Sequence, residues 1–406
     1  MNKDKQYLKR KIIINKFIIL IIIFLITKIK TKKYLDEIEI MKYMRKNRLR
    51  RNIKKQNFEK DLDSIRIYVN QLRQKLIKNN NIILKPRISF IATVYNKEKY
   101  LYSFISSIQN QLIKEFEIIF VDDCSTDNST KIINEFMTKD KRLKLIKNKK
   151  NMGSLFGRSI GAINSKGEYI LFVDSDDIIL KEGLLKIYNY IKLNDLDMIE
   201  FHTIFEKKNS IYVNRRYYKY KNIIYQPMLS YIYYYRKNTG REGNTALWDK
   251  LVKRQIVLQS IKYIGNKYMN EKIIIENDVV ILFALFRNSR SFFYIDEIGY
   301  YYSCTNTDSI THTRYNPQKS NDIINSIFLN IMFLYEHTDN TYYDKSFVIY
   351  KVKQGYKRYK RCFKFLNKGI KLFKLIKKVF NKLLYSKYIS FKDKLYISNI
   401  KHQIIK

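Results

Sequence analysis

The sequence predicts an α/β protein whose mostly parallel sheet is flanked by helices. From Pro86 onward, short β-branched runs alternate with stretches of helical periodicity. Such alternation implies parallel strands joined by right-handed helical crossovers. The 406 residues, of which 46 % are apolar, also suffice for one large core. We expect the chain to divide into four segments, 1–33, 34–85, 86–320 and 321–406.

The first half of the α/β region supplies most of the regular pattern. Strands are expected at 88–94, 117–121, 143–146 and 169–173, and helices at 98–112, at 131–137 and from residue 153. In the first helix, Leu101, Phe104, Ile105, Ile108 and Leu112 share one face. A run rich in turn and N-cap residues, DDCSTDNST, precedes the second helix and marks its start.

Polar residues that follow the strands are expected to meet at one edge of the sheet, because ligands of such sheets bind at the carboxyl ends of the strands. They are Thr93 and Asn96 after the first strand, Asp122 and Asp123 after the second, and Asp174, Asp176 and Asp177 of FVDSDD after the fourth. Carboxylates this close repel one another unless a cation or hydrogen-bond donors hold them. Their hard oxygens suit Mg²⁺ or Mn²⁺, which bind a few carboxylates together with substrate phosphates. The pattern therefore predicts a divalent cation that carries a diphosphate.

Four segments, ISFIATVYNKEKYL, FEIIFVDDCSTDNS, NMGSLFGRSIGA and GEYILFVDSDD, resemble in order and spacing the family-2 glycosyltransferases. The resemblance covers about 87–180 and continues more weakly through NTALWDKLVKRQIV, ENDVVILF and FFYIDEIGYYYSCTNTDSITH. It implies the GT-A nucleotide-diphospho-sugar transferase fold. It also implies metal-dependent transfer of a sugar, with inversion, from a nucleotide-sugar donor to the hydroxyl of an acceptor, which is a glycan, a lipid or a protein.

The resemblance also implies roles for individual residues. Thr93 and Asp123 would meet the nucleotide base, Arg158, Ser175 and Asp177 would bind the nucleotide-sugar, Asp174 and Asp176 would hold Mn²⁺ or Mg²⁺, and Asp278 would be the catalytic base. Two departures from the family pattern stand out. Cys124 replaces the usual glycine, and Asn277 stands where an acidic pair is common, which leaves Glu276 as a rival base.

Several of these residues also have a purely structural interpretation. Asp122 is better explained as a cap of the following helix than as a ligand contact, and a cap is an equal alternative for Asp278. Trp248 is expected in the core rather than as a sugar platform. His312 is expected to bond within a loop rather than to ligate a metal. Residues 300–302, three tyrosines, fit an ordinary strand.

Two other functions remain open. A nucleotidyl- or phosphosugar-transferase on a similar sheet should carry a glycine-rich loop after the first strand, but TVYNKEKY contains no glycine. The second alternative is a basic membrane- or nucleic-acid-binding protein with an inactive transferase-like domain. Its affinity for nucleic acid should fall steeply with salt.

The N-terminal segment predicts a membrane attachment. Residues 12–27 are almost wholly apolar apart from Lys16, and their length approaches the lower limit for a spanning helix. No small-residue cleavage pattern follows, which favours a single-pass signal anchor over a cleaved signal peptide. Such a chain would lie in the Golgi or another endomembrane if its source is eukaryotic. Leucine, isoleucine and valine at helical spacing between 62 and 76 predict a helical stem in 34–85.

The charge of the chain is concentrated at its ends. The formal net charge is +42, of which residues 1–85 and 341–406 carry +17 each and the middle only +8. A nucleic-acid enzyme would carry its basic face on the folded domain, so no nucleic-acid partner is expected. Basic ends instead suit an anionic membrane surface. The basic helical region 321–406 either lies on a membrane or packs with a solvated face.

Overall fold

The computed structural model describes residues 85–207, 210–214, 224–225, 246–303 and 317–337, together with scattered residues between 348 and 401. Nearly all of them belong to one compact unit that begins at Lys85. The expected membrane anchor and stem, His312 and most of the basic C-terminal region lie outside the described residues. No helix within the described part combines the length and the apolar character needed to cross a membrane.

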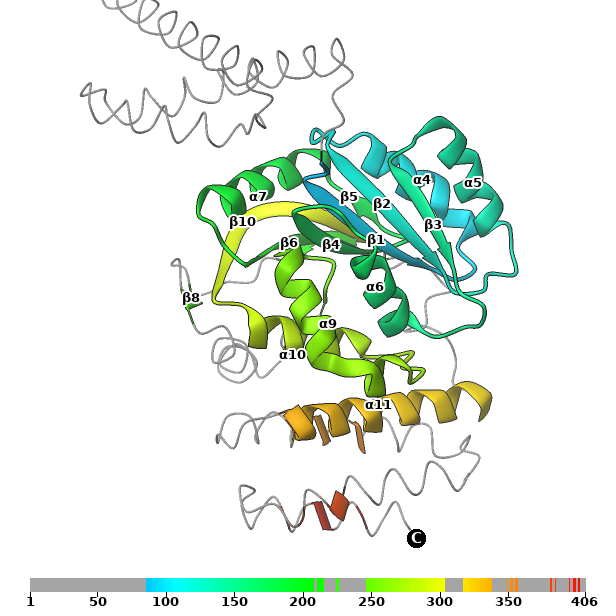
Figure 1. Cartoon of the computed structure of the whole chain (residues 1–406), viewed down its shortest axis with the longest axis vertical. Coiled ribbons are helices and arrows are strands. Elements are labelled where there is room, and N and C mark those ends of the chain that lie inside the picture. The colour runs from blue at the N-terminus through cyan, green and yellow to red at the C-terminus, as the bar shows by residue number, and fades with distance from the viewer. Residues whose placement is uncertain are drawn as a thin grey trace, which may run out of the picture. The chain divides into compact units, whose positions relative to one another are not determined.

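One ten-stranded mixed sheet organises the unit, with a main strand order of β3-β2-β1-β4-β9-β6-β10-β5 (Figure 1). The first four strands are β1 (Ile88–Val94), β2 (Phe116–Asp122), β3 (Leu143–Lys147) and β4 (Tyr169–Asp174). All four run parallel, so their carboxyl ends meet at one edge. They form where the sequence predicted them. Strands β1, β2 and β4 are buried along nearly all of their length, whereas β3, at the end of the strand order, is buried only at Leu143.

The second half of the sheet departs from a purely parallel order. Its strands are β5 (Ile178–Ile179), β6 (Met198–Lys207), β7 (Ser210–Asn214), β8 (Ile224–Tyr225), β9 (Lys250–Lys253) and β10 (Ser291–Ser303). The short strand β9 lies antiparallel between β4 and β6, while β10 pairs in parallel with β6. The α/β class with flanking helices is thus confirmed. The expected mostly parallel sheet is not: among the described strands four pairings are parallel and five are antiparallel, so the sheet is mixed.

Helices cover both faces of the sheet (Figure 1). They are α4 (Glu98–Gln109), α5 (Ser129–Lys139), α6 (Ser154–Ile163), α7 (Lys181–Leu193), α9 (Arg254–Met269), α10 (Asn277–Asn288) and α11 (Pro317–His337). In Figure 1, α4, α5 and α7 lie on one face, and α6, α9 and α10 lie on the other. A continuous hydrophobic core runs from the sheet through α9 and α10 to α11.

Particular predictions can be checked against this core. Four of the five apolar residues predicted on the face of the first helix are buried, but Leu112 is exposed because α4 ends at Gln109. Trp248 is buried and stacks on Tyr300, with ring centroids 4.9 Å apart, so its assignment to the core is confirmed. The three tyrosines of 300–302 do lie in a strand, β10, although only Tyr300 is fully buried.

Candidate active site

The FVDSDD segment forms the end of β4 and the turn that follows it. Asp174 is the last residue of the strand, and its carbonyl oxygen accepts a hydrogen bond of 3.2 Å from the backbone N–H of Asp177. The buried hydroxyl of Ser175 donates to the carbonyl oxygen of Thr93 at 2.9 Å. Because Thr93 pairs with Asp174 in the parallel register, this bond fastens the turn to the end of β1. Ser175 and Thr93 therefore fix the position of the turn relative to the end of β1.

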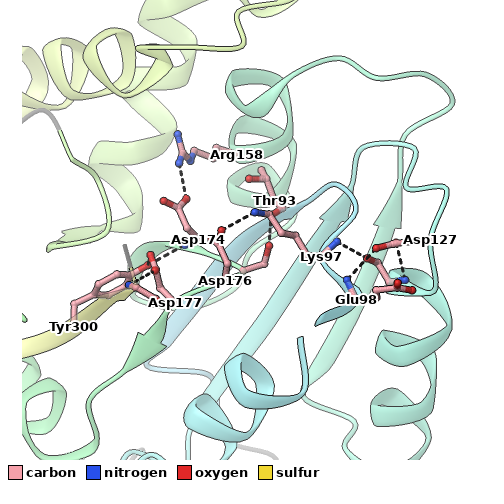
Figure 2. A network of polar contacts seen from close by, with 12 residues as sticks. Thr93, Lys97, Glu98, Asp127, Arg158, Asp174, Asp176, Asp177 and Tyr300 are labelled. Carbon is pink, nitrogen blue, oxygen red and sulfur yellow. Dashed lines mark hydrogen bonds and ion pairs between the residues drawn. The ribbon is translucent and has the colours of Figure 1, made fainter. Parts of the chain in front are cut away.

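Arg158 on α6 joins two acidic residues that are far apart in the sequence. Its Nη2 donates to Asp174 Oδ1 at 2.9 Å (Figure 2). Its Nη1 donates to Oδ1 of Asp278 and of Asn277 at the start of α10. The Arg158 side chain is only 6 % exposed. Burial by itself lowers the pKa of Arg158, but the carboxylates of Asp278 and Asp174 outweigh that effect and the pKa rises. Arg158 is thus a permanent cation between the predicted metal ligand and the predicted base.

The carboxyl of Asp174 is electrostatically unfavourable in its charged form. Burial is the main cause that raises its pKa to about 6, and the negative charges of Asp278 and Asp176 add to the rise while Arg158 opposes it. Nonetheless 31 % of the side chain remains exposed, so a ligand can reach it. A carboxylate that lacks full compensation and stays accessible is suited to bind a further cation.

Lys97 neutralises the second acid of the D-x-D pair. Its Nζ lies 2.6 Å from Asp176 Oδ2, and both side chains are mostly buried. Lys97 lies in the turn between β1 and α4, directly after Asn96, which has a positive φ of 53°. Sequence reasoning missed this residue. Its position after the first strand was the available signal, but one lysine is not distinctive in a chain so rich in lysine.

Asp177 is buried next to Tyr300 and is not exposed at the site (Figure 2). Its carboxylate accepts hydrogen bonds from Tyr300 Oη at 2.8 Å and from the backbone N–H of Ser303 at 3.1 Å, both on β10. The hydroxyl of Tyr300 also accepts the backbone N–H of Asp174 at 3.1 Å. Burial, together with Asp174 and Asp176, holds the pKa of Asp177 well above its usual range. Asp177 therefore fixes the turn against β10, and its contact with a donor stays a prediction.

The acids after β2 organise the loops beside the site. The carboxylate of Asp123 accepts three hydrogen bonds of 2.8 Å, from Asn148 Nδ2 and from the backbone N–H groups of Met152 and Gly153. It thereby holds the loop that leads into α6, and its contact with a nucleotide base stays a prediction. Cys124 has a φ of 67°. This left-handed conformation explains why glycine is usual at its position in the family.

The prediction that Asp122 caps the following helix is wrong. Helix α5 begins at Ser129 with Asn128 at the N-cap position, several residues beyond Asp122. Asp122 Oδ1 instead accepts the backbone N–H of Ser125 at 3.2 Å, within the turn. Asp127 provides the local bond at the helix start, because its Oδ1 accepts the N–H of Ser129 at 2.9 Å. The cluster of capping residues was recognised correctly, but the wrong member was chosen.

Glu276 and Asp278, the two candidate bases, have different surroundings in the structure. Helix α10 begins at Asn277 with Glu276 at the N-cap position, so Asp278 lies in the first turn and is not the N-cap. Asp278 contacts Arg158 and is 25 % exposed. The carboxylate of Glu276 instead forms an ion pair of 3.2 Å with the buried Nζ of Lys351. Asp278 therefore belongs to the cluster that contains Asp174, which makes it the better candidate for the base.

The acidic residues fit a divalent cation that shares its ligands with a substrate. Across the described ranges, no group of three or more His, Cys, Asp and Glu side chains forms a complete metal site. Asp174 at the end of β4 and Asp176 in the turn after it both carry carboxylate oxygens. Mg²⁺ usually takes one or two carboxylates, with phosphates and water supplying its other ligands. These two residues therefore fit the protein's share of a metal–diphosphate site.

Comparison with known proteins agrees with this geometry. The family described as "Glycosyl transferase family 2" matches residues 89–256. An uncharacterized glycosyltransferase of Methanocaldococcus jannaschii is 31 % identical over 55 % of this chain and 73 % of its own length. An uncharacterized glycosyltransferase of Haemophilus influenzae is 45 % identical over 28 % of this chain, a match that spans less than half (45 %) of that relative.

The fold itself is shared with a solved structure. The crystal structure of Staphylococcus aureus TarS 1–349 in complex with UDP superposes with a TM-score of 0.54 at 17 % identity. The superposition covers 79 % of this chain and 89 % of that one. It supports the GT-A-like arrangement that the order of the motifs implied. The family match and the relative from M. jannaschii show that the chain belongs to glycosyl transferase family 2.

Proposed function

We propose that this protein transfers a sugar from a nucleoside-diphosphate-sugar to an acceptor hydroxyl, with inversion at the anomeric carbon. The observation that carries the proposal is the bridge formed by Arg158, which brings Asp174 at the end of β4 next to Asp278 at the start of α10. A site for the donor phosphates thus adjoins a carboxylate that is able to take a proton. TarS, which shares the fold, has been crystallised with UDP and with UDP-GlcNAc, and a uridine nucleotide is accordingly the first donor to test.

The reaction is a single displacement. The acceptor oxygen forms a bond to the anomeric carbon while the bond from that carbon to the diphosphate oxygen breaks. Asp278 accepts the proton of the attacking hydroxyl as the general base, a role that typically contributes about 10²–10⁴-fold to the rate. The carboxylate is partly exposed and held in place by Arg158, so its lone pairs can face an acceptor.

Positive charge at the site favours departure of the nucleoside diphosphate. Arg158 lies 2.9 Å from Asp174, and Lys97 lies 2.6 Å from Asp176, so two cations of the chain stand beside the D-x-D pair. Asp174 and Asp176 would hold Mn²⁺ or Mg²⁺, which when bound stabilises the negative charge on the leaving group. Ser175 and Thr93 keep these carboxylates at the sheet edge through their mutual hydrogen bond.

The test is a donor panel. The full-length protein is incubated with Mn²⁺ and UDP-glucose, UDP-galactose, UDP-GlcNAc or GDP-mannose, and release of nucleoside diphosphate is measured. We expect one donor to be hydrolysed slowly in the absence of acceptor, and expect chelation or Asp174→Asn to abolish the release. Binding of UDP without hydrolysis of any donor would favour an inactive transferase-like domain, while pyrophosphate release from a nucleoside triphosphate and a sugar phosphate would indicate a nucleotidyltransferase.

We also propose that residues 1–33 attach the catalytic domain to a membrane in a single pass. Support comes from the apolar run between 12 and 27 and from the basic residues on both sides of it. An enzyme held in this way would act at the membrane surface, where a lipid-linked acceptor is accessible.

A further inference from the structure

Helix α11 holds the backbone that leads into α10. Ser326 Oγ accepts a hydrogen bond of 3.0 Å from the backbone N–H of Ile274. One turn further along α11, Asn330 Nδ2 donates to the carbonyl oxygens of Ile275 and Glu276 at 3.2 Å each. Both α11 side chains are buried. Three consecutive residues before α10 thus bond to a helix that lies outside the 89–256 family match.

A second contact comes from further along the chain. Lys351 Nζ lies 3.2 Å from Glu276 Oε2, and both side chains are largely buried. Val348 and Val352, on either side of this lysine, belong to the same hydrophobic core as α11. An ion pair between two largely buried side chains restricts the position of both, because a charge in such surroundings is held close to its partner.

The backbone at Glu276 requires such support. Its φ of 52° lies in the left-handed region, which a non-glycine residue adopts only when its surroundings hold it there. Its carbonyl oxygen accepts from Asn330 and also from the N–H of Val279 in the first turn of α10. The conformation of this one peptide therefore sets the direction in which α10 starts, and Asp278 lies two residues beyond it.

We propose that Asn330 and Lys351 are positioning residues for the catalytic base, so that α11 and Lys351 are part of the catalytic unit. Both act through Glu276. Asn330 fixes its carbonyl group and Lys351 its carboxylate, and together they hold Asp278 against Arg158. The inference rests on the proposed function, in which Asp278 is the base. It adds that the two residues lie outside the family match and touch neither donor nor acceptor.

The chain offers matched controls. Ser320 lies on the same helix and is equally buried, and its Oγ has no hydrogen-bond partner within the described structure. Ser320→Ala therefore alters a buried polar group of α11 without touching 274–276. For Lys351, the variant Lys351→Met keeps the length of the side chain and removes its charge, whereas Lys351→Arg retains the charge.

The experiment measures kcat and KM for hydrolysis of the best donor in the panel, the Kd for UDP with Mn²⁺, and the melting temperature of each full-length variant. We expect Asn330→Leu and Lys351→Met to lower kcat by about 10- to 100-fold, since small displacements of a catalytic group have effects of this size. KM and the Kd for UDP should stay within about two-fold of wild type. Lys351→Arg should recover most of kcat, and Ser320→Ala should match wild type.

Double variants with Asp278→Asn test the positioning role of Lys351 separately from the role of Asp278 as the base. If the positioning residues act through Asp278, Lys351→Met should cause no further loss once the base is gone, because coupled residues are not additive. Three results would overturn the positioning role while leaving Asp278 as the base. They are additive losses in the double variant, a native kcat in both Asn330→Leu and Lys351→Met, and a loss of UDP binding that parallels the loss of kcat. Native turnover of Asp278→Asn alone would instead refute the proposed role of Asp278. If Asn330→Leu does not fold, the Lys351 variants decide.

Discussion

The guanidinium of Arg158 donates a hydrogen bond of 2.9 Å to the carboxylate of Asp174 and thereby joins α6 to the end of β4. The same side chain contacts Asp278 on α10. Asp174 and Asp176 of FVDSDD are therefore paired with cations of the chain itself, Arg158 and Lys97, without a metal ion. Arg158 and Lys97 reduce the repulsion between the carboxylates. Burial nonetheless raises the pKa of Asp174, and the charges of Asp278 and Asp176 add to the rise.

Loss of Arg158 should destabilise the protein and abolish turnover. Arg158→Met leaves Asp174 and Asp278 without their shared cation. Because both carboxylates are partly exposed, we expect a loss of about 2–3 kcal/mol in the free energy of unfolding, less than for a fully buried pair. Denaturant unfolding measures this. The control is Lys144→Met, whose pair with Glu117 at 2.6 Å involves a lysine that is 41 % exposed, and which should change stability by less than about 1 kcal/mol. Equal effects of the two variants would contradict a special role for Arg158.

Neutralising Asp278 should remove catalysis and spare donor binding. Asp278→Asn keeps the size of the side chain and its contact with Arg158, but cannot accept the proton of the acceptor. We expect kcat to fall about 10²–10⁴-fold, with the Kd for UDP unchanged in a titration calorimeter. Should Asp278→Asn turn over normally while Glu276→Gln is inactive, the base would be Glu276.

The metal-free stability should depend on pH through Asp174. Its pKa is raised to about 6 in the folded protein from an ordinary value of 3.8, so the folded state binds this proton more tightly than the unfolded chain. The charged carboxylate therefore lowers stability above pH 6, and the penalty disappears as pH falls toward 4. In chelator, Asp174→Asn should melt above wild type at pH 7.5, and the difference should shrink toward zero near pH 4. A variant that melts below wild type at pH 7.5 would show that the bond to Arg158 outweighs burial.

Tyr300 should stabilise the turn that carries the D-x-D pair. Tyr300→Phe removes the hydroxyl that donates to Asp177 and accepts the N–H of Asp174. Two buried polar groups then lose a partner, and we expect a loss of about 1–3 kcal/mol. Thermal unfolding tests this, with Tyr95→Phe as the control, because Tyr95 is 48 % exposed and its hydroxyl should matter little. Equal thermal stabilities of Tyr300→Phe and Tyr95→Phe would show that the turn does not depend on the hydroxyl of Tyr300.

Removal of residues 1–33 should release the protein from membranes. The apolar run between 12 and 27 is the only segment that we propose as an anchor. The truncated protein should move from the membrane pellet to the soluble fraction, whereas the full-length protein should resist a carbonate wash. If the truncated protein still pellets and salt releases it, the basic region 321–406 would be the attachment instead.

Sequence alone determined the first half of the sheet. The run 88–94 became β1 with the predicted bounds, and the other three parallel strands differ from their predicted ends by one residue at most. In β1, β2 and β4, burial on both faces requires a continuous apolar run, which can be recognised without knowledge of the neighbouring strands. The position of Asp174 and Asp176 at the carboxyl edge follows from the same local pattern, because parallel strands all end on one side.

Only the tertiary structure decided which charges meet. Lys97 pairs with Asp176 from 79 positions away, and Arg158 contacts Asp278 across 120 positions. No local pattern encodes these distances, since they depend on how the loops and α10 pack around the sheet. The left-handed Glu276 and its contacts with Asn330 and Lys351 are of the same kind. Periodicity and burial along one segment specify a strand or a helix, but the partner of a buried charge is set by whichever distant residue the packed core brings beside it.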